Sequence, residues 1–449
     1  MKRILLFLLL LSLTITSRAQ NFKAFAPTPP MGWNSYDCYG LCADEQIVRA
    51  NADYMAKNLK KYGWEYIVID ARWFQDNNYK GYSYVDNDTI DVHWEYNIDK
   101  YGRLIPGIKK FPSSKDGKGF KPLIDELHAK GLKFGLHLMR GVPKKSVLLK
   151  TPIKGLESVT ADMISTGENA CSWSHDSYQI NLQAKGAQEY YNSVFDLFAS
   201  WGVDFVKVDD ISCPYSKQEI EMVRKAIDQC GRNIVLSLSP GATPLSEAKH
   251  VAAHANMWRI VGDLWDSWGE LKSLVFVTAK WTPYIEKGAW PDCDMMPLGR
   301  IVINQHPIWG SARNSKFTHD EQELLVNLYC IAKSPMMFGG DMTQMDSYTY
   351  SLLTNKAMLK IHSESINNRV IRNDNNILVW TADAPHSHTH YLAVFNVGND
   401  KKNINISLDC FKNKKKYKLV NLWTNERSCA ESAVQVELLP HQSIVYKIQ

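Results

Sequence analysis

Two aspartates stand at or just beyond the ends of short apolar runs. Asp209 ends Lys207-Val208-Asp209, which closes the apolar stretch 203–208, and Asp263 ends Trp258-Arg259-Ile260-Val261-Gly262-Asp263. A carboxylate at the end of a buried strand is costly unless it is paired or takes part in a reaction. Two acids held in this way suit cleavage of a glycosidic bond, in which one attacks the sugar and the other protonates the leaving oxygen.

The two aspartates suit different roles in such a reaction. Side chains alternate along a strand, so Lys207 and Asp209 share one face, and the ammonium of Lys207 keeps Asp209 ionised, as a nucleophile must be. The second acid of such a pair gives a proton to the leaving group and later takes one from water. The charged neighbour favours Asp209 as the nucleophile, which leaves the second role open to Asp263.

A neighbouring aspartate is an alternative in each case. Asp210 directly follows Asp209, but alternation turns its side chain to the other face of the strand. Asp266 lies three residues beyond Asp263, where a carboxylate is typical of a loop or of the first turn of a helix. Both are weaker candidates for the same two roles.

The elements that must position these residues follow a regular order. Four times, a segment with helical spacing is followed by a glycine and then by a short apolar strand. Repeated helix–strand units indicate a parallel sheet. The pairs are helix 45–61 with strand 66–70, helix 120–130 with strand 134–138, helix 186–201 with strand 205–209, and helix 216–230 with strand 234–239.

Four shorter strands, expected at 31–34, 257–260, 290–294 and 336–340, bring the total to eight. Eight strands with polar residues at their carboxyl ends predict an α/β fold, a (β/α)8 TIM barrel, over residues 20–355. An open, doubly wound sheet is the alternative. It is disfavoured because no glycine-rich phosphate loop follows the first strand.

The pattern changes in the last part of the chain, residues 356–449. Short β-rich runs alternate with turn residues, at 376–381, 391–397, 403–408, 417–423, 433–439 and 443–448. They predict a C-terminal antiparallel β-sandwich domain. His386, His388 and His390 could chelate a metal, but their place just before a strand favours an exposed hairpin turn, and we assign no metal ligand.

The first residues predict a signal peptide over 1–19. Lys2 and Arg3 precede the apolar run 4–11, and Ser17-Arg18-Ala19 places small residues where a signal peptidase cuts. The apolar run is shorter than the roughly 20 residues of a membrane span, so we expect no membrane anchor. The mature chain is expected to begin at Gln20 and to be exported, to the periplasm or the extracellular space.

The net charge and the aromatic content of the chain indicate which partners to expect. Loss of Lys2, Arg3 and Arg18 lowers the formal charge from +5 to +2, which gives no electrostatic basis for binding nucleic acid. The 14 Trp and 21 Tyr suit a carbohydrate partner, whose apolar ring faces pack on aromatic side chains, although most of these residues are expected in the core. The nine Cys show no disulfide spacing and are expected mostly as small core residues.

Six motifs occur in an order that resembles glycoside hydrolase family 27, the α-galactosidase and α-N-acetylgalactosaminidase family. They are Pro29-Pro30-Met31-Gly32-Trp33-Asn34-Ser35, the stretch 66–70, the stretch 131–135, the stretch 202–209, the stretch 258–263, and Asp292-Cys293-Asp294-Met295. The resemblance covers about residues 28–355. It implies a (β/α)8 barrel, a C-terminal β-sandwich, a retaining mechanism and no required metal or other cofactor.

The resemblance also assigns roles by position. Asp209 resembles the family's nucleophile and Asp263 its acid/base. Asp70 resembles the carboxylate that binds the distal hydroxyls of the sugar, Lys207 the donor beside it, and Arg259 the donor near the 2-position. Further substrate-binding residues are expected at Trp33, His137, Ser239 and Asp294, and for Trp33 packing at the barrel end is an equally reasonable interpretation.

Several departures from the family pattern concern the sugar rather than the cleavage. Asp70 is followed by Ala71 where the family commonly has a second acid, His137 replaces a Tyr, and Ile211 replaces a Cys, so the family's disulfide there cannot form. Ser239-Pro240-Gly241 stands where the family offers Cys-Glu-Trp or Cys-Ser-Trp to the 2-substituent. Loss of the second acid removes an acceptor for the 4- and 6-hydroxyls and can change discrimination there.

These observations favour a retaining, exo-acting glycoside hydrolase that releases terminal α-linked galactose through a covalent glycosyl-aspartate intermediate. A β-L-arabinopyranosidase, whose sugar is galactose-like without the 6-hydroxymethyl group, is one alternative. An α-N-acetylgalactosaminidase is another, because Ser239 leaves room for an acetamido group. An exported carbohydrate-binding protein without turnover is the alternative from a different class, and the presence of both carboxylates with charged neighbours argues against it.

Overall fold

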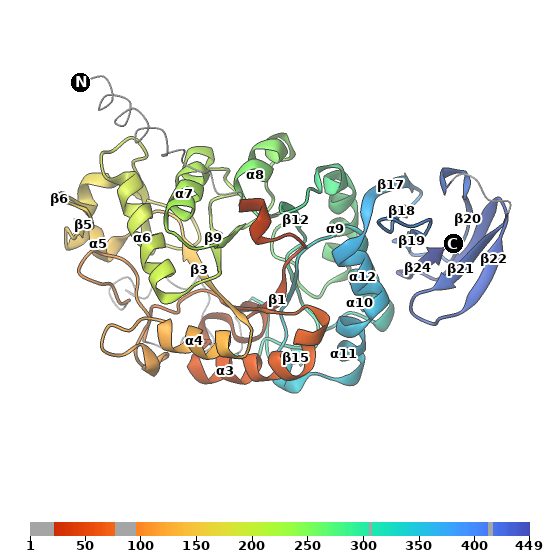
Figure 1. The fold of residues 1–449 in the computed structure, drawn as a ribbon, viewed down its shortest axis with the longest axis horizontal. Coiled ribbons are helices and arrows are strands. Elements are labelled where there is room, and N and C mark those ends of the chain that lie inside the picture. The colour runs from red at the N-terminus through yellow and green to blue at the C-terminus, as the bar shows by residue number, and fades with distance from the viewer. Residues whose placement is uncertain (1–21, 77–95, 305–307, 412–415) are drawn as a thin grey trace, which may run out of the picture.

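The computed structural model describes residues 22–76, 96–304, 308–411 and 416–449, which form a barrel and a smaller β domain side by side (Figure 1). The predicted signal peptide, 1–19, lies outside the described residues. Among the helices in the described ranges, none combines the length and the hydropathy needed to cross a bilayer.

All eight predicted parallel strands are present and close into a ring. They are β1 (Met31–Asn34), β2 (Tyr66–Ile69), β3 (Lys133–Met139), β9 (Phe205–Asp209), β10 (Val235–Leu238), β11 (Met257–Arg259), β12 (Trp290–Asp292) and β16 (Met336–Phe338). From β1 to β12 each of these strands pairs in parallel with the next, and β1 also pairs with β16. β13 (Met295–Met296) continues the line of β12 and pairs with β16, which closes the last side. The (β/α)8 barrel is confirmed, and the open sheet is excluded.

Helices surround the strands because each carries an apolar stripe that packs against the sheet. In α7 (Lys217–Gln229), for example, the buried residues Ile220, Val223 and Ile227 recur every three or four positions. Apart from α5, given below, the other α-helices in the described part of the barrel domain are α2 (Tyr36–Tyr39), α3 (Glu45–Tyr54), α4 (Lys121–Ala129), α6 (Ala187–Trp201), α8 (Ala248–His254), α9 (Trp268–Trp281), α10 (His319–Ile331), α11 (Ser347–Thr354) and α12 (Lys356–Glu364).

The helix predicted over 45–61 changes type before it ends. After α3 the chain continues as the π-helix η3 (Met55–Leu59) and the 3-10 helix η4 (Lys60–Tyr62). Gly63 stops it with a φ of 99°, a left-handed conformation that costs glycine nothing, and the backbone N–H of Gly63 bonds to Lys60 O. The chain is thereby turned toward β2.

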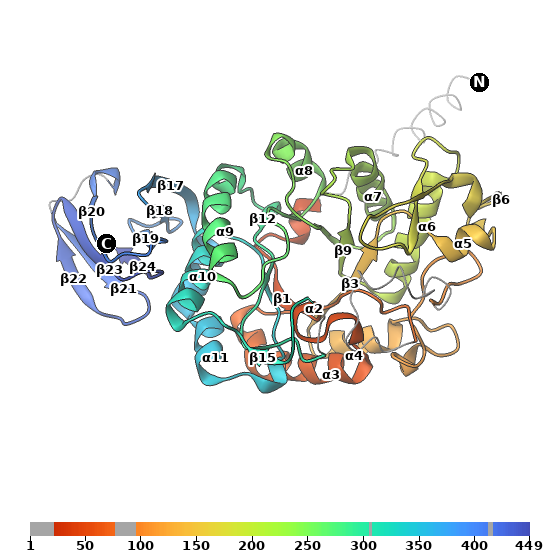
Figure 2. The same cartoon turned by 180° about the vertical axis from the view of Figure 1, so that it is seen from behind.

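A segment that the sequence did not reveal lies between β3 and α6. It forms short strands and one helix, drawn in yellow in Figures 1 and 2, at the end of the molecule opposite the β-sandwich. Its elements are β4 (Val142–Pro143), α5 (Lys144–Leu148), β5 (Pro152–Ile153), β6 (Leu156–Thr160), β7 (Ser165–Asn169) and β8 (Ser177–Ile180). Outside this segment, β14 (Arg300–Ile301) and β15 (Arg313–Asn314) form a small antiparallel pair.

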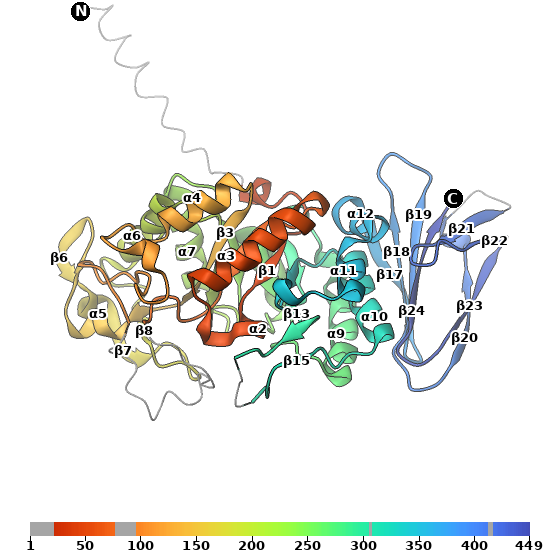
Figure 3. The ribbon, with the colours of Figure 1, turned by 90° about the horizontal axis from the view of Figure 1, so that it is seen from below.

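The C-terminal part is the predicted antiparallel β-sandwich, and Figure 3 shows its two layers. Its apolar core lies between them, with Val379 and Val394 from one sheet in the same cluster as Ile406 and Val436 from the other. One sheet has the order β17 (Ile366–Asp374), β18 (Ile377–Asp383), β19 (His390–Asn396), β24 (Ser443–Ile448), β21 (Tyr417–Asn421), β22 (Arg427–Ala430), and the other pairs β20 (Lys402–Ser407) with β23 (Ala433–Leu438). His386 and His388 are exposed in the turn between β18 and β19.

The two domains share a buried interface. The side chain of Asn327 on α10 donates to Ser443 Oγ at 2.9 Å and accepts from Trp423 Nε1 at 2.8 Å. Trp380 Nε1 donates to Thr282 Oγ1 at 3.2 Å. Residues 356–364, which the sequence analysis placed with the sandwich, form α12, which packs on α10 between the barrel and the sheets (Figures 1 and 3).

Candidate active site

The predicted site residues gather at the carboxyl ends of neighbouring barrel strands, where this fold carries its active sites. Strand register explains why. His137 on β3 pairs with Lys207 on β9, and Lys207 pairs with Ser237 on β10, so the inward-facing side chains of three strands form one layer. Asp70 follows β2, Ser239 follows β10, Arg259 ends β11, and Asp294 follows β12.

Lys207 and Asp70 form a buried ion pair across the barrel. Lys207 Nζ donates to Asp70 Oδ2 at 2.9 Å, and Asn34 Nδ2 donates to the same oxygen at 2.8 Å. Burial alone raises the pKa of Asp70, but Lys207, His137 and Asn34 outweigh it and hold the pKa below its ordinary value. Asp70 is therefore a charged acceptor fixed in orientation.

Asp209 is surrounded by hydrogen-bond donors. Ser239 Oγ donates to Oδ1 at 2.8 Å, the backbone N–H of Asp210 donates to the same oxygen at 3.0 Å, and His137 Nε2 lies 3.0 Å from Oδ2. Because an ionised carboxylate only accepts, His137 donates from Nε2. Burial opposes the charge, but Lys207, His137 and Ser239 hold the pKa of Asp209 well below its usual range.

Asp263 has a different environment. Its side chain is 48% exposed, and Arg259 NH2 donates to Oδ1 at 3.0 Å. The same guanidinium contacts Asp294 Oδ1 through NH1 at 2.6 Å, so one buried arginine lies between two carboxylates. Burial lowers the pKa of Arg259, but Asp294, Asp263 and Asp292 raise it by more, so the guanidinium stays charged. Two carboxylates in unlike environments are what separate nucleophile and acid/base roles require.

Asp294 holds the loop that carries Asp263. The residue has a φ of 86°, and its Oδ2 accepts from the backbone N–H of Leu264, next to Asp263, at 2.7 Å. Burial raises the pKa of Asp294, with Asp263 and Asp292 adding to the effect and Arg259 opposing it. Asp294 is thus a link between the end of β12 and the position of Asp263.

Three residues named from the sequence have structural partners in place of a free face toward a ligand. Trp33 is fully buried, packs edge-on against Tyr39 and donates from Nε1 to Gly340 O at 2.9 Å, so its ring has no exposed surface for a sugar. Asp266 accepts two bonds from Arg313, at 2.6 and 3.0 Å. Asp210 accepts from Arg140 Nε at 3.0 Å.

Three further residues contribute to the site and were not predicted. Asn34 orients Asp70, and its place beside Trp33 in the first motif was a usable sign. Tyr36 lies near the site carboxylates, since burial first and then the charges of Asp263, Asp70 and Asp209 raise its pKa. Arg140 binds Asp210 and, through NH1 at 3.2 Å, Glu219, so it steadies the peptide that donates to Asp209.

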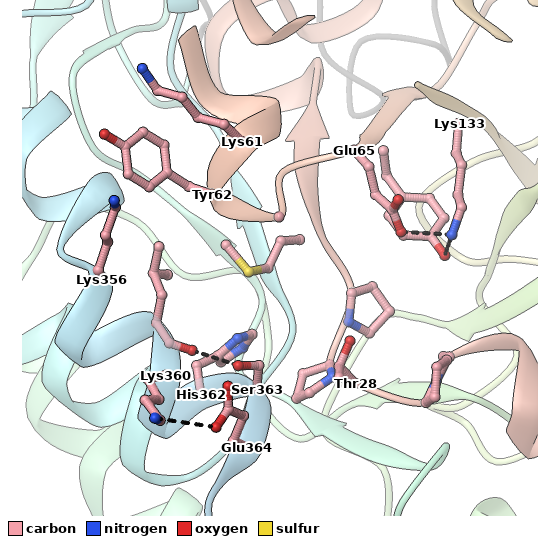
Figure 4. Close-up of a pocket in the computed structure, with 18 of the residues that line it drawn as sticks. Thr28, Lys61, Tyr62, Glu65, Lys133, Lys356, Lys360, His362, Ser363 and Glu364 are labelled. Atoms are coloured by element: carbon pink, nitrogen blue, oxygen red, sulfur yellow. Dashed lines mark hydrogen bonds and ion pairs between the residues drawn. The ribbon is translucent and has the colours of Figure 1, made fainter. Parts of the chain in front are cut away.

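Two cavities lie at opposite ends of the barrel, and the candidate site residues line only one of them. A small cavity of about 20 Å³ reaches beneath these residues and is lined by Lys207, Ser239, Arg259 and Asp294 among others. The larger cavity, about 460 Å³, lies at the opposite end, where Met31, Tyr66 and Lys133 begin their strands. Figure 4 shows this second cavity, with Lys61, Tyr62 and Lys356 along one side and Glu65 with Lys133 on the other. None of the predicted site residues, all of which are described, lines it.

Two family models match the chain. The model described as alpha galactosidase A matches residues 179–364, and that of the alpha galactosidase C-terminal beta sandwich domain matches residues 374–448. The first match contains Lys207, Asp209, Ser239, Arg259, Asp263 and Asp294.

Similar proteins extend the match to nearly the whole chain. The crystal structure of a GH27 β-L-arabinopyranosidase from Geobacillus stearothermophilus is 41% identical, with a TM-score of 0.90 over 96% of this chain and 99% of the other. A structure from Bacillus halodurans, provisionally named an α-N-acetylgalactosaminidase, is 40% identical, with a TM-score of 0.83 over 94% and 97%. The α-galactosidase of Oryza sativa is 26% identical over 79% of this chain and 68% of its own length. The chain is a glycoside hydrolase and belongs to glycoside hydrolase family 27.

Proposed function

We propose that this chain is a retaining exo-glycosidase that removes terminal β-L-arabinopyranosyl groups, and the closely related α-D-galactosyl groups more slowly. The observation that carries the retaining mechanism is the state of Asp209: buried, accepting three hydrogen bonds and held ionised. An ionised carboxylate aimed into the barrel mouth is a nucleophile for the anomeric carbon.

The reaction then proceeds in two steps. A carboxylate oxygen of Asp209 attacks the anomeric carbon while protonated Asp263 gives its proton to the leaving oxygen, which forms a glycosyl-aspartate. Asp263, half exposed and open to solvent, then takes a proton from water, which displaces Asp209 and releases the sugar with its original configuration. Arg259 donates a hydrogen bond to Asp263 and Asp294 accepts one from the backbone of the next residue, so both position the acid/base.

Position 71 supports the choice of sugar. Asp70 is fixed by Lys207 and Asn34 and can accept from the distal hydroxyls of a galacto-configured ring, while the next residue is the buried Ala71 in place of a second acid. The side chain of Ala71 offers no hydrogen-bond acceptor to a 6-hydroxyl, and a β-L-arabinopyranoside has no 6-hydroxyl to bind. The 41% identity to the Geobacillus β-L-arabinopyranosidase, against 26% to the Oryza α-galactosidase, points the same way.

A panel of p-nitrophenyl glycosides tests the substrate. We expect kcat/KM on the β-L-arabinopyranoside to exceed that on the α-D-galactoside by about tenfold or more. The two sugars differ by one hydroxymethyl group, and a difference of that size in a binding pocket changes the transition-state free energy by about 1 to 3 kcal/mol. The two matching family models are described as those of alpha galactosidases, which favours the α-D-galactoside instead. A higher kcat/KM on the α-D-galactoside would identify the chain as an α-galactosidase. Preference for the α-N-acetylgalactosaminide would overturn both assignments.

The stereochemistry is tested separately on the preferred substrate. Proton NMR of the first released sugar, recorded before mutarotation, is expected to show the anomeric configuration of the substrate. The opposite anomer would exclude the glycosyl-aspartate route while leaving the substrate preference intact.

We also propose that the enzyme is exported after removal of residues 1–19. The basic start, the apolar run 4–11 and the small residues before Gln20 support this. Mass spectrometry of the protein from the producing cell should give a chain that begins at Gln20 in the periplasmic or extracellular fraction. An intact Met1 in the cytoplasmic fraction would contradict the proposal.

A further inference from the structure

Two histidines and a glutamate meet on the outside of the barrel, on helices that do not contribute to the active site. His250 and His254 lie one turn apart on α8, so they share a face of that helix. Glu221 faces them from α7, and one ligand atom of each residue lies within 4.8 Å of the other two. Figures 1 and 2 both show α7 and α8 next to each other.

Each histidine has one ring nitrogen already fixed by a neighbour. Tyr215 OH is hydrogen-bonded to His250 Nδ1, and His254 Nδ1 is hydrogen-bonded to His250 O at 2.8 Å. Nε2 of His250 is in turn hydrogen-bonded to Glu221 Oε1 at 3.1 Å, and the two rings stack with centroids 4.2 Å apart. Histidines that bind metals are typically held through their other nitrogen in this way.

The spacing of the ligand atoms suits a cation. His250 Nε2 lies 3.1 Å from Glu221 Oε1, close to the roughly 3.3 Å between ligand atoms in a tetrahedral zinc site with bonds of about 2.0 to 2.1 Å. A metal ion between the two atoms would take the place of this hydrogen bond, and histidine ligates metals as the neutral ring. Lys217, on the same helix as Glu221, is paired with Glu247 at 3.9 Å.

We propose that Glu221, His250 and His254 bind one Zn²⁺ ion, with water at the fourth position. Two histidines and one carboxylate form a known zinc ligand set. The ion would join α7 to α8, the helices that follow the strands β9 and β10. It lies outside the catalytic cluster, and its expected effect is to stabilise the fold, because a ligand that binds only the native state raises the melting temperature.

Calorimetric titration of the chelator-treated, full-length protein with Zn²⁺ tests the site. We expect one ion per chain. Glu221→Gln, a conservative change at an exposed position, should weaken binding at least tenfold, and so should His254→Ala. His388→Ala, which removes a histidine from the exposed turn before β19, is the matched control and should bind as the wild type does. Equal affinity in wild type, Glu221→Gln and His254→Ala would overturn the proposal.

Exposed thiols at Cys213, Cys410 and Cys429 are competing ligands that must be distinguished. Co²⁺ in place of Zn²⁺ should give visible bands of nitrogen and oxygen ligation without a thiolate charge-transfer band. A strong thiolate band that persists in Glu221→Gln would also overturn the proposal. Zn²⁺ should raise the melting temperature of the wild type and of His388→Ala but not that of Glu221→Gln, and none of these measurements depends on the identity of the sugar.

Discussion

Lys207 Nζ lies 2.9 Å from Asp70 Oδ2, although Lys207 stands two residues before Asp209 on the same face of β9. The lysine therefore serves two carboxylates by different means. It bonds directly to Asp70, the proposed sugar ligand, and acts on Asp209 through its charge, while His137 and Ser239 supply the direct bonds to the nucleophile.

Lys207→Met is expected to lower the free energy of unfolding by about 3 to 5 kcal/mol, because Asp70 is left buried without its cation. Adding Asp70→Asn to that variant removes the uncompensated charge and should restore part of the loss. Urea unfolding of the wild type, both single variants and the double variant measures the coupling. A cost below about 1 kcal/mol for Lys207→Met would mean that the pair is as weak as a surface ion pair.

Ser239→Ala should move the acid limb of the kcat/KM profile to higher pH. The pKa of Asp209 is lowered in the native enzyme, so activity is present above that pKa and is lost as the pH falls through it. A hydrogen bond to a charged group contributes about 1.5 to 3 kcal/mol, so its loss shifts the limb by about one to two pH units. Ser237→Ala, two residues earlier on β10, is the matched control, and an equal shift in both variants would contradict the assignment.

Most of the barrel could be predicted because its strands are buried on both sides and appear as continuous apolar runs. β1, β2 and β9 were located within about a residue, and β16 ends two residues earlier than predicted. β17 and β22 were missed because they are edge strands with mostly exposed, polar residues and carry no alternation that a sequence pattern can show. The small strands between β3 and α6 are only two to five residues long, too short for an alternating pattern to be recognised.

That the candidate residues lie close together could be predicted from their place at strand ends, but their hydrogen-bond partners could not. The bond from Lys207 to Asp70 joins strands 137 residues apart and depends on barrel closure. The same closure turns the ring of Trp33 into the core. Asn34 and Arg140 were missed because their roles are bonds to other side chains, Asp70 and Asp210, rather than chemistry of their own.

Asp263→Ala should lose activity most on substrates with poor leaving groups, because those need the proton that Asp263 gives. With a p-nitrophenyl glycoside the first step survives, and the glycosyl-enzyme accumulates. Added azide, which needs no base to attack, should restore turnover and give a glycosyl azide. Asp266→Ala is the matched control and should show no azide dependence. Azide rescue in Asp266→Ala but not in Asp263→Ala would exchange the two roles.

His362 should make the enzyme less stable in mild acid. The ring is fully buried, and burial lowers its pKa to about 4. The unfolded chain binds a proton below about pH 6.5 that the native protein rejects until about pH 4, so stability falls as the pH drops through this window, by about 3 kcal/mol in all. His362→Gln keeps a donor for Ser334 O and should flatten the curve. Equal losses in both proteins between pH 7 and 4.5, measured by urea unfolding, would refute this.

The identity of the nucleophile is tested most directly by trapping the intermediate. The wild-type enzyme is incubated with an activated fluorosugar that forms the glycosyl-enzyme quickly and hydrolyses slowly, then digested and examined by tandem mass spectrometry. The account predicts a single labelled peptide with the sugar on Asp209. A sugar on Asp210 or on any other residue, or rapid turnover of the reagent with no covalent species, would contradict it.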